Sequence, residues 1–204
     1  MFPTVAVVEL GLGGLAWTVA WMVAYEGPAD VVDRLTRPEL LSRDLIWGIA
    51  ATLPMFAMAW LVERSRWRPL RYLRLVVHKL VVSAFSDCST WQIALVSMLA
   101  GFGEELFFRG IMLDALRGNG GMTWIVAVAL LVSSLLFGLA HAMTRAYLVL
   151  ATLIGLYLGG LLLLSESLLV PMMTHAVYDF VLLEYFLGRR DRNPTRERGA
   201  LPGS

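Results

Sequence analysis

Long apolar stretches separated by short polar segments dominate this chain. Six of them are long enough to cross a membrane as helices, because a hydrocarbon core of about 30 Å needs about 20 mostly apolar residues. They cover Thr4–Tyr25, Asp44–Val62, Trp91–Leu113, Met122–Ala142, Ala146–Leu164 and Ser167–Leu187. The pattern predicts an all-α fold, a polytopic transmembrane bundle of about six spans in a single domain over residues 1–188. The polar segment 189–204 is expected to be a disordered cytoplasmic tail.

One further stretch, Arg71–Phe85, has a mixed pattern. Apolar residues recur there at helical spacing, but Arg71, Arg74, His78 and Lys79 interrupt them. This pattern is typical of an amphipathic helix that lies in the membrane interface or re-enters it, rather than one that crosses.

Basic residues gather in two places and predict the topology. Six lie between residues 64 and 79, and five lie between residues 189 and 198. Basic segments beside membrane spans stay in the cytoplasm, and both clusters lie there only if an even number of spans separates them. Four spans follow Lys79, so Arg71–Phe85 is expected not to cross and both termini are expected to be cytoplasmic. The loop Glu26–Arg43 is then expected on the opposite side.

The composition agrees with a membrane protein and excludes other classes. The chain has 204 residues, 58% of them hydrophobic and 16% charged, against about 45–50% and about 25% in soluble domains. Its formal net charge is +1 and no basic stripe is interleaved with aromatic residues, so nucleic acid is not an expected partner. The single cysteine, Cys88, forms no internal disulfide and supports no Cys-based zinc or redox site.

Three ionisable residues lie inside the third predicted span. A charge at such depth is unfavourable by roughly 2.5–3.5 kcal/mol on the insertion scale, and ionisable residues in spans usually face the bundle interior and mark function. Glu105 and Arg109 are four residues apart, which predicts an ion pair with a structural role. Glu104 projects about 100° away around the helix and is predicted to be an unpaired carboxylate, the candidate general base. Gly101 and Gly103 just before it would allow another helix or a substrate to approach closely.

Two of the three histidines also lie in predicted spans. His141 ends an apolar run, and His175 precedes Asp179 by four residues on one helical face. A buried histidine is often structural, but Glu104, the two histidines and Asp179 come from three separate spans. Together they could bind a metal ion or form a general-base site. By depth, His141 reaches the others only if its span tilts or the turn at Thr144 dips into the bundle.

Three short motifs in successive spans resemble those of a known family. Residues 104–109 (EELFFR) match E-E-x-x-x-R, residues 137–141 (FGLAH) match F-x-x-x-H, and residues 175–179 (HAVYD) match H-x-x-x-[ND]. In this order they resemble the CPBP family, also called Abi, which contains CAAX prenyl endopeptidases and many bacterial relatives. The resemblance covers about residues 91–187, and the first two spans carry no recognisable motif.

The resemblance implies an intramembrane endopeptidase of the glutamate type that needs neither a metal nor another cofactor. Glu104 and His141 would hold and activate the water that attacks the scissile carbonyl. His175 and the residue at position 179 would stabilise the oxyanion. Glu105 and Arg109 would be the supporting pair.

Position 179 departs from the pattern of the prenyl-protein proteases, which tend to have Asn there. An asparagine can donate an N–H, whereas Asp179 donates only when it is protonated. Asp179 would otherwise orient His175, much as a carboxylate orients the histidine of other proteases.

Three interpretations stay open. The first is the metal-independent glutamate protease, and the second is a metalloprotease that uses Glu104, His141 and His175 as ligands but lacks the H-E-x-x-H helix. The third is a non-catalytic immunity or scaffold protein with the same fold. Expected partners are membrane lipid and a membrane-anchored peptide or protein, prenylated or otherwise lipid-linked. The bacterial relatives indicate the inner membrane of a bacterium, while the natural substrate and the oligomeric state are not indicated by the sequence.

Overall fold

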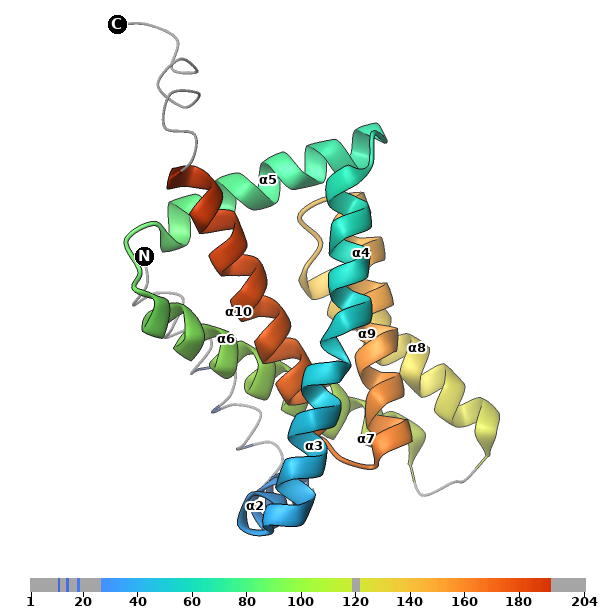
Figure 1. Ribbon diagram of the computed structural model, residues 1–204. Helices are drawn as coiled ribbons and strands as arrows, with labels where there is room; N and C mark the ends of the chain where they lie inside the picture. The colour runs from blue at the N-terminus through green and yellow to red at the C-terminus, as the bar shows by residue number, and fades with distance from the viewer. Residues whose placement is uncertain (1–10, 12–13, 15–17, 19–26, 119–121, 192–204) are drawn as a thin grey trace, which may run out of the picture.

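The computed structural model of this chain describes residues 27–118 and 122–191, together with Gly11, Gly14 and Thr18. Within those residues every element is a helix, so the all-α prediction is confirmed (Figure 1). Most of the predicted span Thr4–Tyr25 and the tail beyond residue 191 lie outside the described residues. In chain order the elements are α2 (Gly27–Thr36), α3 (Pro38–Ala50), α4 (Thr52–Arg64), α5 (Arg68–Phe85), α6 (Thr90–Glu105), η1 (Leu106–Met112), α7 (Leu113–Arg117), α8 (Thr123–Ala140), α9 (Arg145–Ser165) and α10 (Leu169–Asp191).

Among the described residues, three helical segments are long and apolar enough to cross a membrane by themselves. They are Pro38–Arg64, which joins α3 and α4, together with α8 and α9. The segment Thr90–Arg117, which contains the predicted span Trp91–Leu113, passes the same test only together with α5, to which it is bent by 116°. Helix α10 covers most of the predicted span Ser167–Leu187 but is less apolar because it carries three acids, two arginines and a histidine. These helices make the chain an integral membrane protein.

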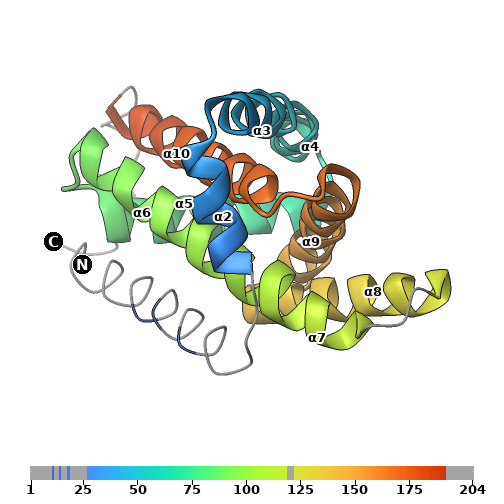
Figure 2. The ribbon, with the colours of Figure 1, turned by 90° about the horizontal axis from the view of Figure 1, so that it is seen from below.

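Helix α10 lies at the centre of the bundle, which explains why it tolerates polar residues. It contacts α3, α4, α5, α6 and α9 (Figure 1), and Figure 2 shows it beside α6, with α8 at the outer edge. Helices α6 and α10 approach closely at Gly101, where an added Cβ would lie 2.7 Å from the backbone nitrogen of Ala176. The close helix approach predicted at Gly101 is therefore present, and it sets the distance between the glutamates of α6 and the histidine of α10.

The segment Glu26–Arg43, expected to be a loop, is mostly helical, so that expectation is wrong. Helix α2 occupies its first half, and Pro38 starts α3 at a position where its missing N–H is not needed. Charged side chains hold these helices to the bundle. Asp44 is 1% exposed, with one carboxylate oxygen 3.0 Å from Arg34 and 2.6 Å from the Ser167 hydroxyl. Arg34 of this segment is thus used in a contact between elements.

Helix α5 lies across one end of the bundle, steeply inclined to α6 (Figure 1). Leu73 and Val81 are buried on its inner side, whereas Tyr72 and Leu75 are 62% and 71% exposed. Arg74 stabilises the bend between α4 and α5, because its Nη1 donates to three backbone carbonyls at the C-terminal end of α4. This orientation fits the predicted interfacial helix, whose depth in a membrane stays a prediction.

Candidate active site

The two adjacent glutamates end α6, and the chain then widens into the π-helix η1. π-Helices are rare and are found frequently at functional sites. A side chain from α8 supports this one, since the Ser133 hydroxyl donates to the carbonyl of Phe108 at 2.9 Å. The π-helix sets the course of the chain from the glutamates to Arg109. The sequence analysis missed it, because the residues of η1 carry no pattern that distinguishes it from an α-helix.

The predicted ion pair between Glu105 and Arg109 is present. Arg109 Nη1 lies 2.7 Å from Glu105 Oε1, and the two side chains are 1% and 0% exposed. The same guanidinium donates to the carbonyl of Gly155 at 3.3 Å and lies over the ring of Phe137, 4.3 Å from its centre. Arg109 therefore connects the end of α6 with both α8 and α9.

His175 lies between two carboxylates. Its Nδ1 is 2.9 Å from Glu105 Oε1, and its Nε2 is 3.4 Å from Asp179 Oδ2. Because an ionised carboxylate only accepts hydrogen bonds, both ring nitrogens carry protons when the two acids are ionised. The pairing with Asp179 follows the predicted spacing, whereas the contact with Glu105 was missed. Oε1 of Glu105 therefore accepts from both His175 and Arg109.

Glu104 and His141 face each other at the end of α8. Glu104 Oε2 lies 3.5 Å from His141 Nε2, while His141 Nδ1 lies 2.8 Å from the carbonyl oxygen of Phe137. That carbonyl can only accept, so in the neutral ring Nδ1 carries the proton and Nε2 presents a lone pair toward Glu104. His141 reaches this position because it follows the last turn of α8, in the bend that leads to Thr144 at the start of α9.

Phe137 lies at the centre of the site. Its ring centre is 4.4 Å from that of His141 and 6.0 Å from that of His175, in addition to the contact with Arg109. The side chain is 3% exposed. The sequence analysis assigned Phe137 no role beyond its place in the F-x-x-x-H motif. The residues around it come from three different elements, so no regular separation along the sequence indicated these contacts.

The charges of the site are unequal. Three carboxylates, those of Glu104, Glu105 and Asp179, meet two cations, Arg109 and the doubly protonated His175. Glu105 and Asp179 contact those cations directly. Oε2 of Glu104 is buried and accepts no hydrogen bond from any residue that the structure describes. Glu104 is thus the acid whose acceptor capacity is least used.

The carboxylates and imidazoles of the site are arranged in separate pairs rather than around one point. Among the residues that the structure describes, no three His, Cys, Asp or Glu side chains are placed so that they could share one metal ion. The two histidines instead contact different acids: His141 faces Glu104, whereas His175 contacts Glu105 and Asp179.

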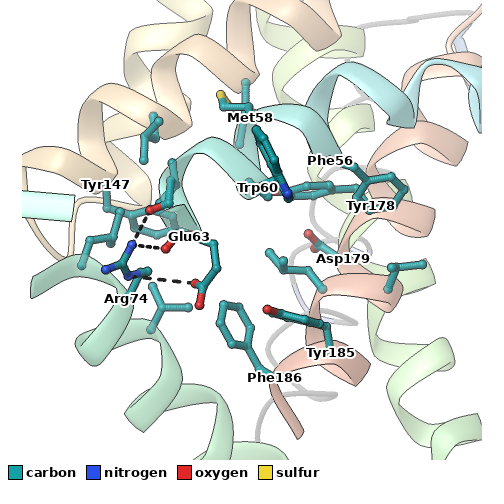
Figure 3. A pocket seen from close by; sticks show the side chains of 18 residues that line it. Phe56, Met58, Trp60, Glu63, Arg74, Tyr147, Tyr178, Asp179, Tyr185 and Phe186 are labelled. Carbon is teal, nitrogen blue, oxygen red and sulfur yellow. Dashed lines mark hydrogen bonds and ion pairs between the residues drawn. The ribbon is translucent and has the colours of Figure 1, made fainter. Parts of the chain in front are cut away.

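A cavity of about 330 Å³ lies beside these groups, between α4, α5, α9 and α10 (Figure 3). Asp179 lines it, and so does Tyr147, whose ring centre is 6.3 Å from that of His141. Glu63 and Arg74, 4.0 Å apart, lie across the cavity from Asp179. Most of the remaining wall is apolar or aromatic and includes Phe56, Trp60, Leu73, Val77, Tyr178 and Phe186.

Comparison with known proteins places these residues in a family. Residues 86–181 match the family model described as Rce1-like, type II CAAX prenyl endopeptidase. A protein of Escherichia coli described as "Uncharacterized 24.3 kDa protein" is 33% identical over 135 residues, which are 63% of this chain and 58% of that relative. No solved structure matches the chain at a significant level. The matched region contains all three motifs, and over residues 86–181 this chain matches the Rce1-like family of CAAX prenyl endopeptidases.

Proposed function

We propose that this chain is an intramembrane endopeptidase that hydrolyses a peptide bond of a membrane-anchored substrate with a water activated by Glu104 and His141. The observation that carries the proposal is the 3.5 Å separation of Glu104 Oε2 and His141 Nε2. The hydrogen bond from His141 Nδ1 to the Phe137 carbonyl leaves both facing atoms as acceptors.

Two facing acceptors suit a water molecule, which has two protons to donate. One O–H would point to Glu104 and the other to His141, so that a lone pair of the oxygen is free to attack the substrate carbonyl carbon. As the C–O bond forms, Glu104 takes a proton and the carbonyl electrons move to the oxygen. The same proton is then delivered to the amide nitrogen as the C–N bond breaks, which regenerates the carboxylate.

His175 is the proposed donor to the oxyanion. Its Nδ1–H is held by Glu105 at 2.9 Å, whereas the contact of its Nε2–H with Asp179 is long, at 3.4 Å. The more weakly held N–H is the one that can turn to a developing negative charge, where a fixed donor is worth far more than in water. In this scheme Asp179 orients His175 and does not donate to the oxyanion itself.

The cavity supports a substrate with a lipid or prenyl anchor. Its apolar wall ends at Asp179 and Tyr147, so an isoprenoid or acyl chain in the cavity would place an attached peptide beside the histidines. The cavity is lined by Glu63 and Arg74 beside the bend between α4 and α5, the side predicted to face the cytoplasm. We place the enzyme in the inner membrane of a bacterium, with substrate entering from that side.

The test of the chemistry is Glu104→Gln, compared with Glu39→Gln at an exposed position in the first turn of α3. Each protein is reconstituted in vesicles with a prenylated reporter peptide, with and without chelator, and its metal content is measured. We expect Glu104→Gln to keep its fold and to lose roughly 10²–10⁴-fold in rate, with Glu39→Gln unchanged. Full activity of Glu104→Gln would favour the non-catalytic immunity or scaffold protein. Stoichiometric zinc, with activity lost to chelator and restored by zinc, would establish the metalloprotease.

The test of the substrate class uses the cavity wall. Ala59 lines the cavity and Ala57 on the same helix is exposed, so Ala59→Phe and Ala57→Phe form a matched pair. We expect Ala59→Phe to raise KM for a prenylated peptide and to leave its unprenylated counterpart unaffected. An equal effect on both peptides would show that the cavity does not hold the anchor.

A further inference from the structure

The outer face of α5 combines cations with exposed apolar side chains. Arg68, Arg71, Tyr72, Leu75 and Lys79 project within about 100° of one another around the helix, and all five are exposed. The opposite face packs inward and forms part of the cavity wall. The two faces of α5 therefore have different surroundings, and the outer one is exposed in the part of the chain that the structure describes.

No acid neutralises this outer face. The chain has no Asp or Glu between Glu63 and Asp87, and Glu63 faces the cavity on the inner side. Some exposed arginines elsewhere do have acidic partners: Arg37 pairs with Asp33 at 2.9 Å, and Arg117 pairs with an acid in its own helix. In the part of the chain that the structure describes, no ion pair joins the three outer cations of α5 to an acid. Among the described residues these three cations therefore have no acidic counter-ion, which leaves them available to an anion from outside the chain.

The apolar side chains on the outer face of α5 indicate which kind of anion binds there. Leu75 is 71% exposed and lies between Arg71 and Arg68 around the helix, and Tyr72 is 62% exposed and lies next to Lys79. An acidic peptide or free phosphate would leave these side chains in water. A membrane interface instead offers phosphate oxygens to the cations and acyl chains to the apolar side chains at once.

We infer that the outer face of α5 binds the headgroups of anionic phospholipids, with Arg68, Arg71 and Lys79 at the phosphates and Tyr72 and Leu75 inserted below them. Each basic side chain near an anionic surface strengthens attachment by about fivefold, and salt weakens the effect. This lipid contact is independent of peptide hydrolysis, so it can be measured without substrate.

The experiment measures lipid selectivity of the full chain. The purified protein is reconstituted in phosphatidylcholine vesicles that contain one quarter phosphatidylglycerol, with trace spin-labelled phosphatidylglycerol or phosphatidylcholine. Electron paramagnetic resonance then gives the fraction of each label that the protein immobilises. The variant is Arg68→Gln with Arg71→Gln. The matched control is Arg37→Gln with Arg117→Gln, which removes the same charge from exposed arginines that have acidic partners.

We expect the unaltered protein to immobilise phosphatidylglycerol about twofold more than phosphatidylcholine. The α5 variant should lower this preference toward equality, and the control should keep it. The lysine variant, Arg68→Lys with Arg71→Lys, retains both charges and should restore the preference, which excludes misfolding as the cause. An equal preference in the α5 variant and the control would overturn the inference. Binding of a soluble polyglutamate peptide in place of phosphatidylglycerol would overturn it in favour of an acidic protein partner.

Discussion

Replacing Gly101 with alanine tests whether the spacing of α6 and α10 holds the site together. An added Cβ would lie 2.7 Å from the backbone nitrogen of Ala176 and 2.9 Å from the carbonyl oxygen of Met172, where ordinary contact begins at 3.4 Å. Backbone atoms cannot rotate away, so the two helices must separate by about half an ångström. Overpacking of this kind costs about 1–3 kcal/mol. The separation also moves Glu105 away from His175, whose contact is only 2.9 Å long.

The matched control is Gly160→Ala in α9, where an added Cβ meets nothing within 4 Å. Alanine in a helix interior is favourable by up to about 1 kcal/mol relative to glycine, and this term acts in both variants. Their difference therefore isolates the contact with α10. For a chain of this size we expect the melting midpoint of Gly101→Ala to lie about 2–12 °C below that of Gly160→Ala.

The assay combines thermal unfolding in detergent with cleavage of a membrane-anchored peptide. A misplacement of about 1 Å can cost 10²-fold in rate, so we expect Gly101→Ala to lose roughly tenfold at temperatures where it is still folded. Equal midpoints and equal rates for the two variants would refute the reasoning, because they would show that α6 and α10 can separate without consequence.

Three further predictions concern the ion pair, position 179 and the topology. Arg109→Ala should lower the yield of folded protein as well as activity, because truncating one member of a buried pair costs about 3–5 kcal/mol; an abundant, well-folded and inactive variant would instead make Arg109 a residue of the chemistry. Asp179→Asn should keep at least about a tenth of the rate, since the amide oxygen still accepts from the imidazole and only about 0.5–1.5 kcal/mol of hydrogen bonding is altered; a rate as low as that of Asp179→Leu would show that the charge is needed. In a cysteine-free background, Arg68→Cys and Arg192→Cys should be labelled from the same side of the membrane, and labelling from opposite sides would show that α5 crosses.

The chain's helical character could be predicted from sequence because the membrane leaves few alternatives. An apolar segment in lipid must satisfy its backbone hydrogen bonds internally, so a run of about 20 apolar residues predicts a helix almost without regard to its neighbours. The contact between Glu105 and Arg109 could be predicted for a similar reason, since a separation of four residues brings side chains together within one helical segment. Both inferences rest on local geometry.

The loop expected at Glu26–Arg43 shows where local reasoning was insufficient. The segment was expected to be a loop between spans, but its Arg34 contacts Asp44 of α3, which also accepts from Ser167 just before α10. Whether a charged residue faces water or a partner depends on what the rest of the chain places beside it. That information is absent from a short window of sequence.

The tertiary structure alone decided which groups from different helices of the site contact each other. Glu105 and His175 are 70 residues apart in the chain, and their contact exists only because Gly101 lets α6 and α10 approach closely. Phe137 lies between the two histidines for the same kind of reason, as does the cavity that four separate helices enclose. The sequence by itself determined which chemical groups are present and which lie within one helix of each other. Their distances across the bundle follow from how whole helix surfaces pack, which no spacing along the chain encodes.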